Sequence, residues 1–254
     1  MALIFSANSG RCGSRFLSAA IGHLTGIPSF HEPCPWLINE VCRDINNAEV
    51  KFSENTKRVL YEKIRFIIEN ARDGWYCETS QMFIKCLVDT VLLNFKDVYV
   101  IYLERNLDEV LLSYYRKCWR REIDWFLQPQ WKANFLRKKG NFSFMDIVEF
   151  NWHEVKARYE AYKHRFTKTW EFDFKDMNNL DEYYRMFDHF GMEYRKIKRF
   201  PPLIKEHKNV LAEAEKAGGR EKAMIEDMRN NWDLPPMKRW RFPLDIIQIN
   251  SKQG

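Results

Sequence analysis

The segment from Asp97 to Leu103 constrains the fold most, because it reads Asp-Val-Tyr-Val-Ile-Tyr-Leu, a run of β-branched and aromatic residues. An unbroken apolar strand is expected where helices cover both faces of a parallel sheet. Further strands are expected at 3–7, 26–31, 75–79 and 167–172, and helices at 16–24, 54–72, 81–94, 106–121, 143–165 and 179–190. This alternation predicts an α/β protein, a three-layer fold with a central parallel sheet flanked by helices.

The chain length predicts a single domain, since 254 residues with 45% hydrophobic content can build one sizeable core. We expect this domain to span 1–254, with a core over 1–192 and a helical C-terminal extension and tail over 193–254. In the helix expected at 54–72, the apolar face is predicted to contain Val59, Leu60, Ile64, Ile67 and Ile68.

Composition excludes some classes of protein. The hydrophobic content is too high for a disordered chain, and no apolar run reaches the ~18–20 residues that span a bilayer. The first residues lack a secretory pattern, and the six cysteines are scattered without zinc-ligand spacing, so we expect reduced thiols and a cytoplasmic location. The net charge of +6 suits an anionic ligand, nucleic acid or an anionic surface equally.

The turn after the first predicted strand has the composition of an anion site. Residues 9–15 read Ser-Gly-Arg-Cys-Gly-Ser-Arg and lead from strand to helix, where backbone N–H groups and the helix dipole attract anions. Gly13 would allow close approach of a ligand, and Arg11 and Arg15 add charged donors. The plainer interpretation is a connection with two surface arginines. The Lys of a nucleotide-hydrolase loop is missing, because Ser14 follows Gly13.

A second segment, from Leu103 to Arg116, places an arginine at the end of a strand and a serine eight residues later. Arg105 would leave the sheet at its carboxyl edge, where ligands bind in open α/β folds. Ser113 would lie about two turns into the next helix, within reach of the same phosphate. The plainer interpretation is an arginine beside a solvated helix, with Ser113 incidental.

Together the two segments resemble the signatures of the sulfotransferase family that uses 3′-phosphoadenosine 5′-phosphosulfate (PAPS). Residues 11–17 are similar to its first signature, with Cys12 for a usual Ser and Arg15 for a usual hydroxyl residue, and 103–116 are similar to its 3′-phosphate segment. A weaker likeness covers 169–174 and 180–192. The resemblance implies a P-loop-type fold and PAPS as co-substrate, without a metal. It implies these cofactor-binding residues: Arg11, Cys12, Gly13, Ser14, Arg15, Arg105 and Ser113.

Sulfuryl transfer needs positioning, charge stabilisation on the leaving phosphate and a base for the acceptor proton. Arg11 and the loop amides would hold the leaving phosphate. The base candidates lie in Phe30-His31-Glu32-Pro33, which resembles a segment of family members that use a Glu. Glu32 is the favoured base and His31 the alternative, since histidine has a reference pKa of ~6.5. In the plainer interpretation both belong to a polar loop.

The acceptor is expected to be a hydroxyl, or less readily an amine, of a small molecule or carbohydrate. Two alternatives stay open: a kinase for nucleotides or small molecules with a P-loop fold, and a non-catalytic module that binds a nucleotide or sulfate. Residues 78–80 (Glu-Thr-Ser) would face the acceptor at the sheet edge. Basic and aromatic residues at 116–139 would pack on the core or form a wall of the acceptor pocket, and nucleic acid is not expected as a partner.

Overall fold

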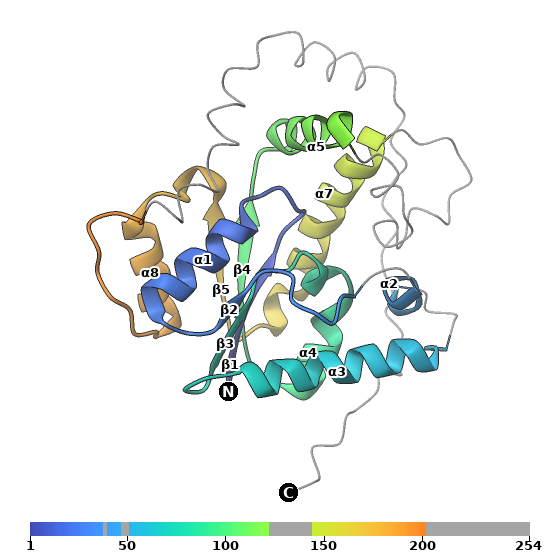
Figure 1. Cartoon of the computed structure of the whole chain (residues 1–254), viewed down its shortest axis with the longest axis horizontal. Helices are drawn as coiled ribbons and strands as arrows, with labels where there is room; N and C mark the ends of the chain where they lie inside the picture. The colour runs from blue at the N-terminus through green and yellow to red at the C-terminus, as the bar shows by residue number, and fades with distance from the viewer. Residues whose placement is uncertain (38–39, 47–50, 122–143, 202–254) are drawn as a thin grey trace, which may run out of the picture.

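Five parallel strands form one sheet in the order β2-β3-β1-β4-β5 in the computed structural model, which describes residues 1–37, 40–46, 51–121 and 144–201 (Figure 1). The predicted α/β class with a central parallel sheet is confirmed. The strands are β1 (Ala2–Ala7), β2 (Ser29–Phe30), β3 (Trp75–Glu78), β4 (Asp97–Glu104) and β5 (Lys168–Asp173).

Helices cover both faces of the sheet. On one face lie α1 (Ser14–Thr25) and α8 (Leu180–Phe190), and on the other lie α3 (Glu54–Asn70), α4 (Val88–Asn94) and α7 (Phe144–Tyr162), with the short α2 (Glu40–Ile45) beside α3 (Figure 1). Successive β1 side chains enter opposite layers, as strand geometry requires. Ile4 joins the apolar cluster under α1 and α8, whereas Leu3 and Phe5 join the one under α3 and α7.

The connections place the first arginine turn and Arg105 at a topological switch point. After β1 the chain enters α1 on one face, whereas after β4 it passes through α5 (Leu107–Arg121), beyond the sheet edge, to α7 on the opposite face (Figure 1). β1 and β4 are hydrogen-bonded neighbours, so their carboxyl ends lie side by side at this switch point. Open α/β sheets bind ligands at such points.

Most predicted elements are present, but four details differ. The expected strand at 26–31 is only β2, because its pairing with β3 covers Ser29 and Phe30 alone. The expected helix at 81–94 begins as a π-helical turn, η1 (Phe83–Leu87), before α4. The short α2 was not predicted. Ile68 is 55% exposed, so it does not belong to the buried face of α3.

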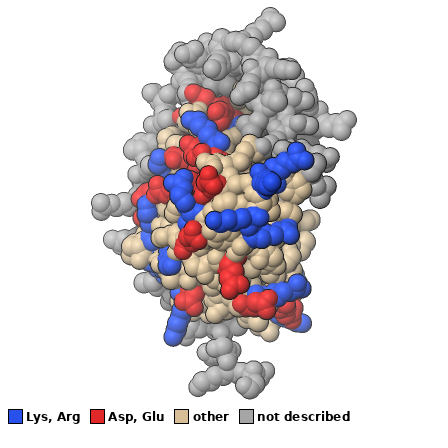
Figure 2. All heavy atoms as spheres, turned by 90° about the vertical axis from the view of Figure 1, so that its left-hand side faces the viewer, with Lys and Arg blue, Asp and Glu red and all other residues tan. Residues whose placement is uncertain are grey.

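Two predicted segments fall largely outside the described residues. Residues 122–143 of the basic aromatic segment and 202–254 of the C-terminal extension are among them, and 193–201 contain no helix. In the part of the chain that is described, no helix is both long and apolar enough to cross a bilayer. On the face that carries α1 and α8, acidic and basic side chains are interspersed (Figure 2).

Candidate functional site

The carboxyl ends of the strands bring the predicted site residues to one edge of the sheet. The turn with Arg11 follows β1, His31 and Glu32 follow β2, and Arg105 follows β4. All strands are parallel, so these segments emerge on the same side. The sequence-based placement of the candidate residues at this edge agrees with the observed topology.

The turn after β1 is held from behind by two helices. The Ser9 carbonyl oxygen accepts hydrogen bonds from Asn151 Nδ2 of α7 at 2.7 Å and from Tyr114 Oη of α5 at 3.2 Å. Asn8 Oδ1 accepts a bond from the Gly10 amide at 3.0 Å. These contacts fix the backbone of the turn before any ligand arrives, which is the condition for an effective anion cradle.

Gly10 is required by its surroundings as well as by its backbone. Its φ of +82° lies in the left-handed region, and an ideal Cβ there would lie 2.3 Å from Tyr114 Oη and 2.8 Å from Gln81 Oε1. The turn therefore packs directly against side chains of α5 and of the segment after β3. Gly13 also has a left-handed φ and precedes α1, whose N-terminus carries no side-chain cap. Uncapped amide groups at the N-terminus of a helix favour an anion.

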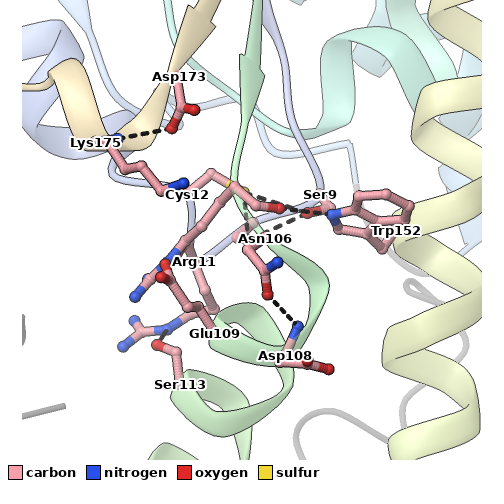
Figure 3. Close-up of polar contacts among 12 residues, drawn as sticks. Ser9, Arg11, Cys12, Asn106, Asp108, Glu109, Ser113, Trp152, Asp173 and Lys175 are labelled. Atoms are coloured by element: carbon pink, nitrogen blue, oxygen red, sulfur yellow. Dashed lines mark hydrogen bonds and ion pairs between the residues drawn. The ribbon is translucent and has the colours of Figure 1, made fainter. Parts of the chain in front are cut away.

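The two arginine segments, 94 residues apart, are in direct contact (Figure 3). Arg11 Nε donates to Ser113 Oγ at 3.0 Å, and Arg105 Nη1 donates to the Arg11 carbonyl oxygen at 2.7 Å. The side chain of Arg11 thus lies at Ser113, and the side chain of Arg105 lies at the Arg11 backbone. The sequence suggested separate phosphate groups for Arg11 and Ser113, so direct contact between these two residues was not predicted.

Arg105 is buried, with only 4% exposure, and is fixed on three sides. Its Nε donates to Glu109 Oε2 at 3.1 Å, and its guanidinium lies 4.0 Å from the centroid of the Phe174 ring. Trp152 Nε1 donates to the Arg105 carbonyl oxygen at 2.9 Å. The contacts to Arg11 and Glu109 use two of the five N–H donors of the guanidinium. Its plane is therefore set in advance, which favours recognition of a phosphate-like oxyanion.

Three other predicted residues of the turn differ in accessibility. Cys12 is buried, its Sγ lies 3.3 Å from Ser9 Oγ, and it donates to the Gly10 carbonyl oxygen at 3.1 Å. Burial raises the pKa of this thiol, so it stays protonated and packs beneath the turn. Cys12 can therefore serve a ligand only through its backbone. Ser14 is buried at the start of α1, whereas Arg15 is exposed.

A glutamine, Gln81, connects Glu32 to the turn after β1. Its side chain is exposed, and its Oε1 accepts a hydrogen bond from Gln81 Nε2 at 3.2 Å. Gln81 in turn packs against Gly10. Glu32 and Arg11 are two of the three non-glycine residues with positive φ among the described residues, at +50° and +56°. Backbone strain of this kind, of order 1–3 kcal/mol per residue, concentrates at functional sites.

His31 also approaches the turn, through Thr79. Thr79 Oγ1 donates to the Ser14 carbonyl oxygen at 2.8 Å, and His31 Nδ1 lies 3.3 Å from both Oγ1 and the carbonyl oxygen of Thr79. Because the Thr79 hydroxyl proton is used at Ser14, both oxygens act as acceptors toward the ring. Nδ1 then carries a proton that faces Thr79.

The expectation that residues 78–80 face the acceptor is wrong for Glu78. Its side chain is 2% exposed, and Oε1 pairs with Lys63 Nζ of α3 at 2.9 Å. Its Oε2 accepts a hydrogen bond from Tyr76 Oη at 2.7 Å. Lys63 Nζ also donates to the Pro33 carbonyl oxygen at 3.1 Å. Glu78 thus belongs to a buried ion pair that anchors the segment after Glu32.

Three residues near the site were not predicted from the sequence: Phe174, Gln81 and Lys85, whose Nζ donates to Gln81 Oε1 at 3.2 Å. Phe174 directly follows β5, so its position at the sheet edge was the available signal. Gln81 and Lys85 lie in a segment that reads as an ordinary helix start, and nothing in the sequence marks them. Among the described residues, no group of three or more His, Cys, Asp or Glu side chains is arranged to hold a metal ion.

Comparisons with known proteins add little to this geometry. No protein-family model matches the chain, and no curated protein matches it in sequence. Among solved structures it is similar to the sulfotransferase domain of the olefin synthase of Synechococcus PCC 7002, with a TM-score of 0.48 and 11% identity over 92% of this chain and 95% of that chain.

Proposed function

We propose that this protein is a PAPS-dependent sulfotransferase, which moves a sulfuryl group to a hydroxyl, or less readily an amine, of a small-molecule or carbohydrate acceptor. The observation that carries the proposal is the contact of the two arginine segments at the switch point: Arg11 Nε bonds to Ser113 Oγ at 3.0 Å, and Arg105 bonds to the Arg11 backbone at 2.7 Å. A ligand with phosphate groups at both ends of a nucleoside matches this cluster of fixed donors beside an uncapped helix N-terminus.

In this proposal the residues divide between the two ends of the nucleotide. The amides of residues 10–15 and Arg11 hold the 5′-phosphosulfate and stabilise charge on the leaving phosphate. Arg105 and Ser113 hold the 3′-phosphate, which supplies binding energy away from the reacting sulfur. Arg11 lies between the two groups, because its side chain already contacts Ser113.

Glu32 serves as the base in the proposed reaction. As the acceptor oxygen bonds to sulfur, the bond between sulfur and the bridging phosphate oxygen breaks, and its electron pair stays on the 5′-phosphate. The acceptor proton passes to the Glu32 carboxylate. Glu32→Gln should abolish transfer and leave binding of adenosine 3′,5′-bisphosphate nearly unchanged. Full activity in Glu32→Gln with loss in His31→Ala would assign the base to His31 instead.

Calorimetry tests the proposal without knowledge of the acceptor. Adenosine 3′,5′-bisphosphate should bind without magnesium, and adenosine 5′-monophosphate should bind more weakly because it lacks the 3′-phosphate. Preference for ATP with a requirement for magnesium would support a kinase and refute the proposal. Binding of the bisphosphate together with failure to transfer sulfuryl to any acceptor in a broad screen would support the binding module.

A further inference from the structure

A line of polar side chains runs from Glu32 into the interior of the protein. Glu32 Oε1 accepts a hydrogen bond from Gln81 Nε2 at 3.2 Å, and Gln81 Oε1 accepts one from Lys85 Nζ, also at 3.2 Å. Glu32 is exposed, whereas Gln81 and Lys85 are only 6% and 5% exposed. One amide therefore connects a solvent-facing carboxylate to a buried ammonium group.

The ammonium group decides which way the amide points. A lysine ammonium has only donors, so it requires the carbonyl oxygen of Gln81 and excludes its NH2 group. With the oxygen turned to Lys85, the NH2 group is turned to Glu32 and donates to it. If the amide were flipped, its NH2 group would face the ammonium group of Lys85, donor against donor. Its carbonyl oxygen would face the carboxylate of Glu32, acceptor against acceptor. Lys85 thus sets the donor that meets the carboxylate.

Lys85 occupies an unfavourable position for a cation. Burial lowers its pKa to about 8, and the charged or titratable groups that face it are Glu154 and Arg158 of α7, Cys42 of α2 and the adjacent Cys86. Glu154 is already paired with Arg158 at 2.6 Å, and Arg158 Nη1 donates to the Lys85 carbonyl oxygen at 2.5 Å. Because burial of an ammonium group costs free energy, a lysine at this position points to a role in orienting Gln81.

The backbone conformation at Lys85 also supports a functional role. Lys85 lies in the π-helical turn η1, and π-helical turns are frequent at functional sites. Gln81 Oε1 also lies 2.8 Å from the position of a Cβ on Gly10. The amide that meets Glu32 therefore packs against the turn that would hold the phosphosulfate, so the base and the anion site share one contact.

We propose that Lys85 and Gln81 form a positioning relay for Glu32. The relay ties Oε1 of the carboxylate to the Gln81 amide and leaves Oε2 to take the proton of the acceptor hydroxyl. Lys85 and Gln81 are positioning residues, since they act through Glu32. The role rests on the proposed function, whereas the directed hydrogen bonds can be tested separately.

The test uses NMR of the full chain labelled with 15N in glutamine side chains, with the Gln81 signal identified by its loss in Gln81→Met. Two responses are expected of this signal when Lys85 is present. The Gln81 NH2 signal should shift in Glu32→Gln, and it should change with pH around the value of about 8 at which Lys85 loses its proton. In Lys85→Met both responses should disappear, and Lys85→Arg should restore the response to Glu32→Gln. Lys96→Met, which removes an exposed lysine, is the control and should leave both responses intact.

A second measurement covers the case in which Lys85→Met does not fold. With 15N in lysine side chains, Gln81→Leu should move the Lys85 titration to lower pH, because the ammonium loses an acceptor that favours its charged form. The relay would be refuted if the Gln81 NH2 signal were unchanged in both Glu32→Gln and Lys85→Met. It would also be refuted if the Lys85 titration were unchanged in Gln81→Leu. Both outcomes are independent of what the protein binds. Failure to bind adenosine 3′,5′-bisphosphate would instead refute the proposed function, and the NMR responses of Gln81 and Lys85 would be unaffected.

Discussion

Gly10→Ala tests whether the turn after β1 is held as tightly as its contacts indicate. The substitution adds one methyl group at a residue with a φ of +82°. Forcing a side chain into the left-handed region costs about 1–2 kcal/mol. The new Cβ would also meet Tyr114 Oη at 2.3 Å and Gln81 Oε1 at 2.8 Å, distances at which something must move.

The second part of the cost comes from that displacement. Moving Tyr114 breaks its hydrogen bond to the Ser9 carbonyl oxygen, worth about 1 kcal/mol. Crowding a filled site adds about 1–3 kcal/mol. The free energy of unfolding should therefore fall by about 3–6 kcal/mol, a large part of the roughly 5–15 kcal/mol of a typical domain.

Gly26→Ala is the matched control. Gly26 has a similar φ of +76°, and no described atom lies within 4 Å of its ideal Cβ, so it isolates the backbone cost of about 1–2 kcal/mol. Urea unfolding monitored by circular dichroism should separate the two variants by about 2–4 kcal/mol. The loss from Gly10→Ala should also be smaller in a Tyr114→Phe background, which lacks the nearest clashing atom. Equal losses for Gly10→Ala and Gly26→Ala would refute the packing argument.

Three further predictions follow from individual contacts. Lys63→Met should lower the free energy of unfolding by about 3–5 kcal/mol because it leaves Glu78 buried without its partner, and in urea unfolding the added change Glu78→Gln should recover part of the loss. Ser113→Ala should weaken binding of adenosine 3′,5′-bisphosphate about fivefold in calorimetry, since one hydroxyl contact is lost, and an unchanged affinity would remove Ser113 from the proposed site. The pKa of Lys85 is lowered from 10.5 to about 8 on folding, so between these values the unfolded chain binds more protons and stability rises with pH. Lys85→Met should lack this rise, which urea unfolding at pH 7.5 and pH 10 would measure.

The sheet was predictable because its signals are local. The unbroken apolar run of β4 indicates a doubly covered strand, and β1 and β3 are short apolar segments that are followed by helical patterns. Parallel strands then place every strand-to-helix turn at one edge. For this reason the sequence alone predicts that Arg11, Glu32 and Arg105 lie at the same edge of the sheet.

The contacts behind the site were not predictable, because they depend on packing between distant segments. Ser9 is held by Asn151 of α7, and Arg105 stacks on Phe174 after β5, yet neither partner belongs to a recognisable motif. Ile68 shows the same limit within one helix. Its spacing places it near the apolar face of α3, but the buried face runs through Ile64 and Ile67 and leaves Ile68 exposed.

The cost of burying Lys85 is what distinguishes the two candidates for the base. His31 is held by Thr79, whose hydroxyl and carbonyl groups lie at the end of a strand whatever the function. Glu32 is held by Gln81, and Gln81 is oriented by a lysine whose burial disfavours its charged form. The orientation of Gln81 therefore requires the burial of an ammonium group, which costs free energy, whereas the two oxygens of Thr79 that contact His31 carry no charge. The arrangement therefore favours Glu32, the residue that the buried lysine serves, as the base.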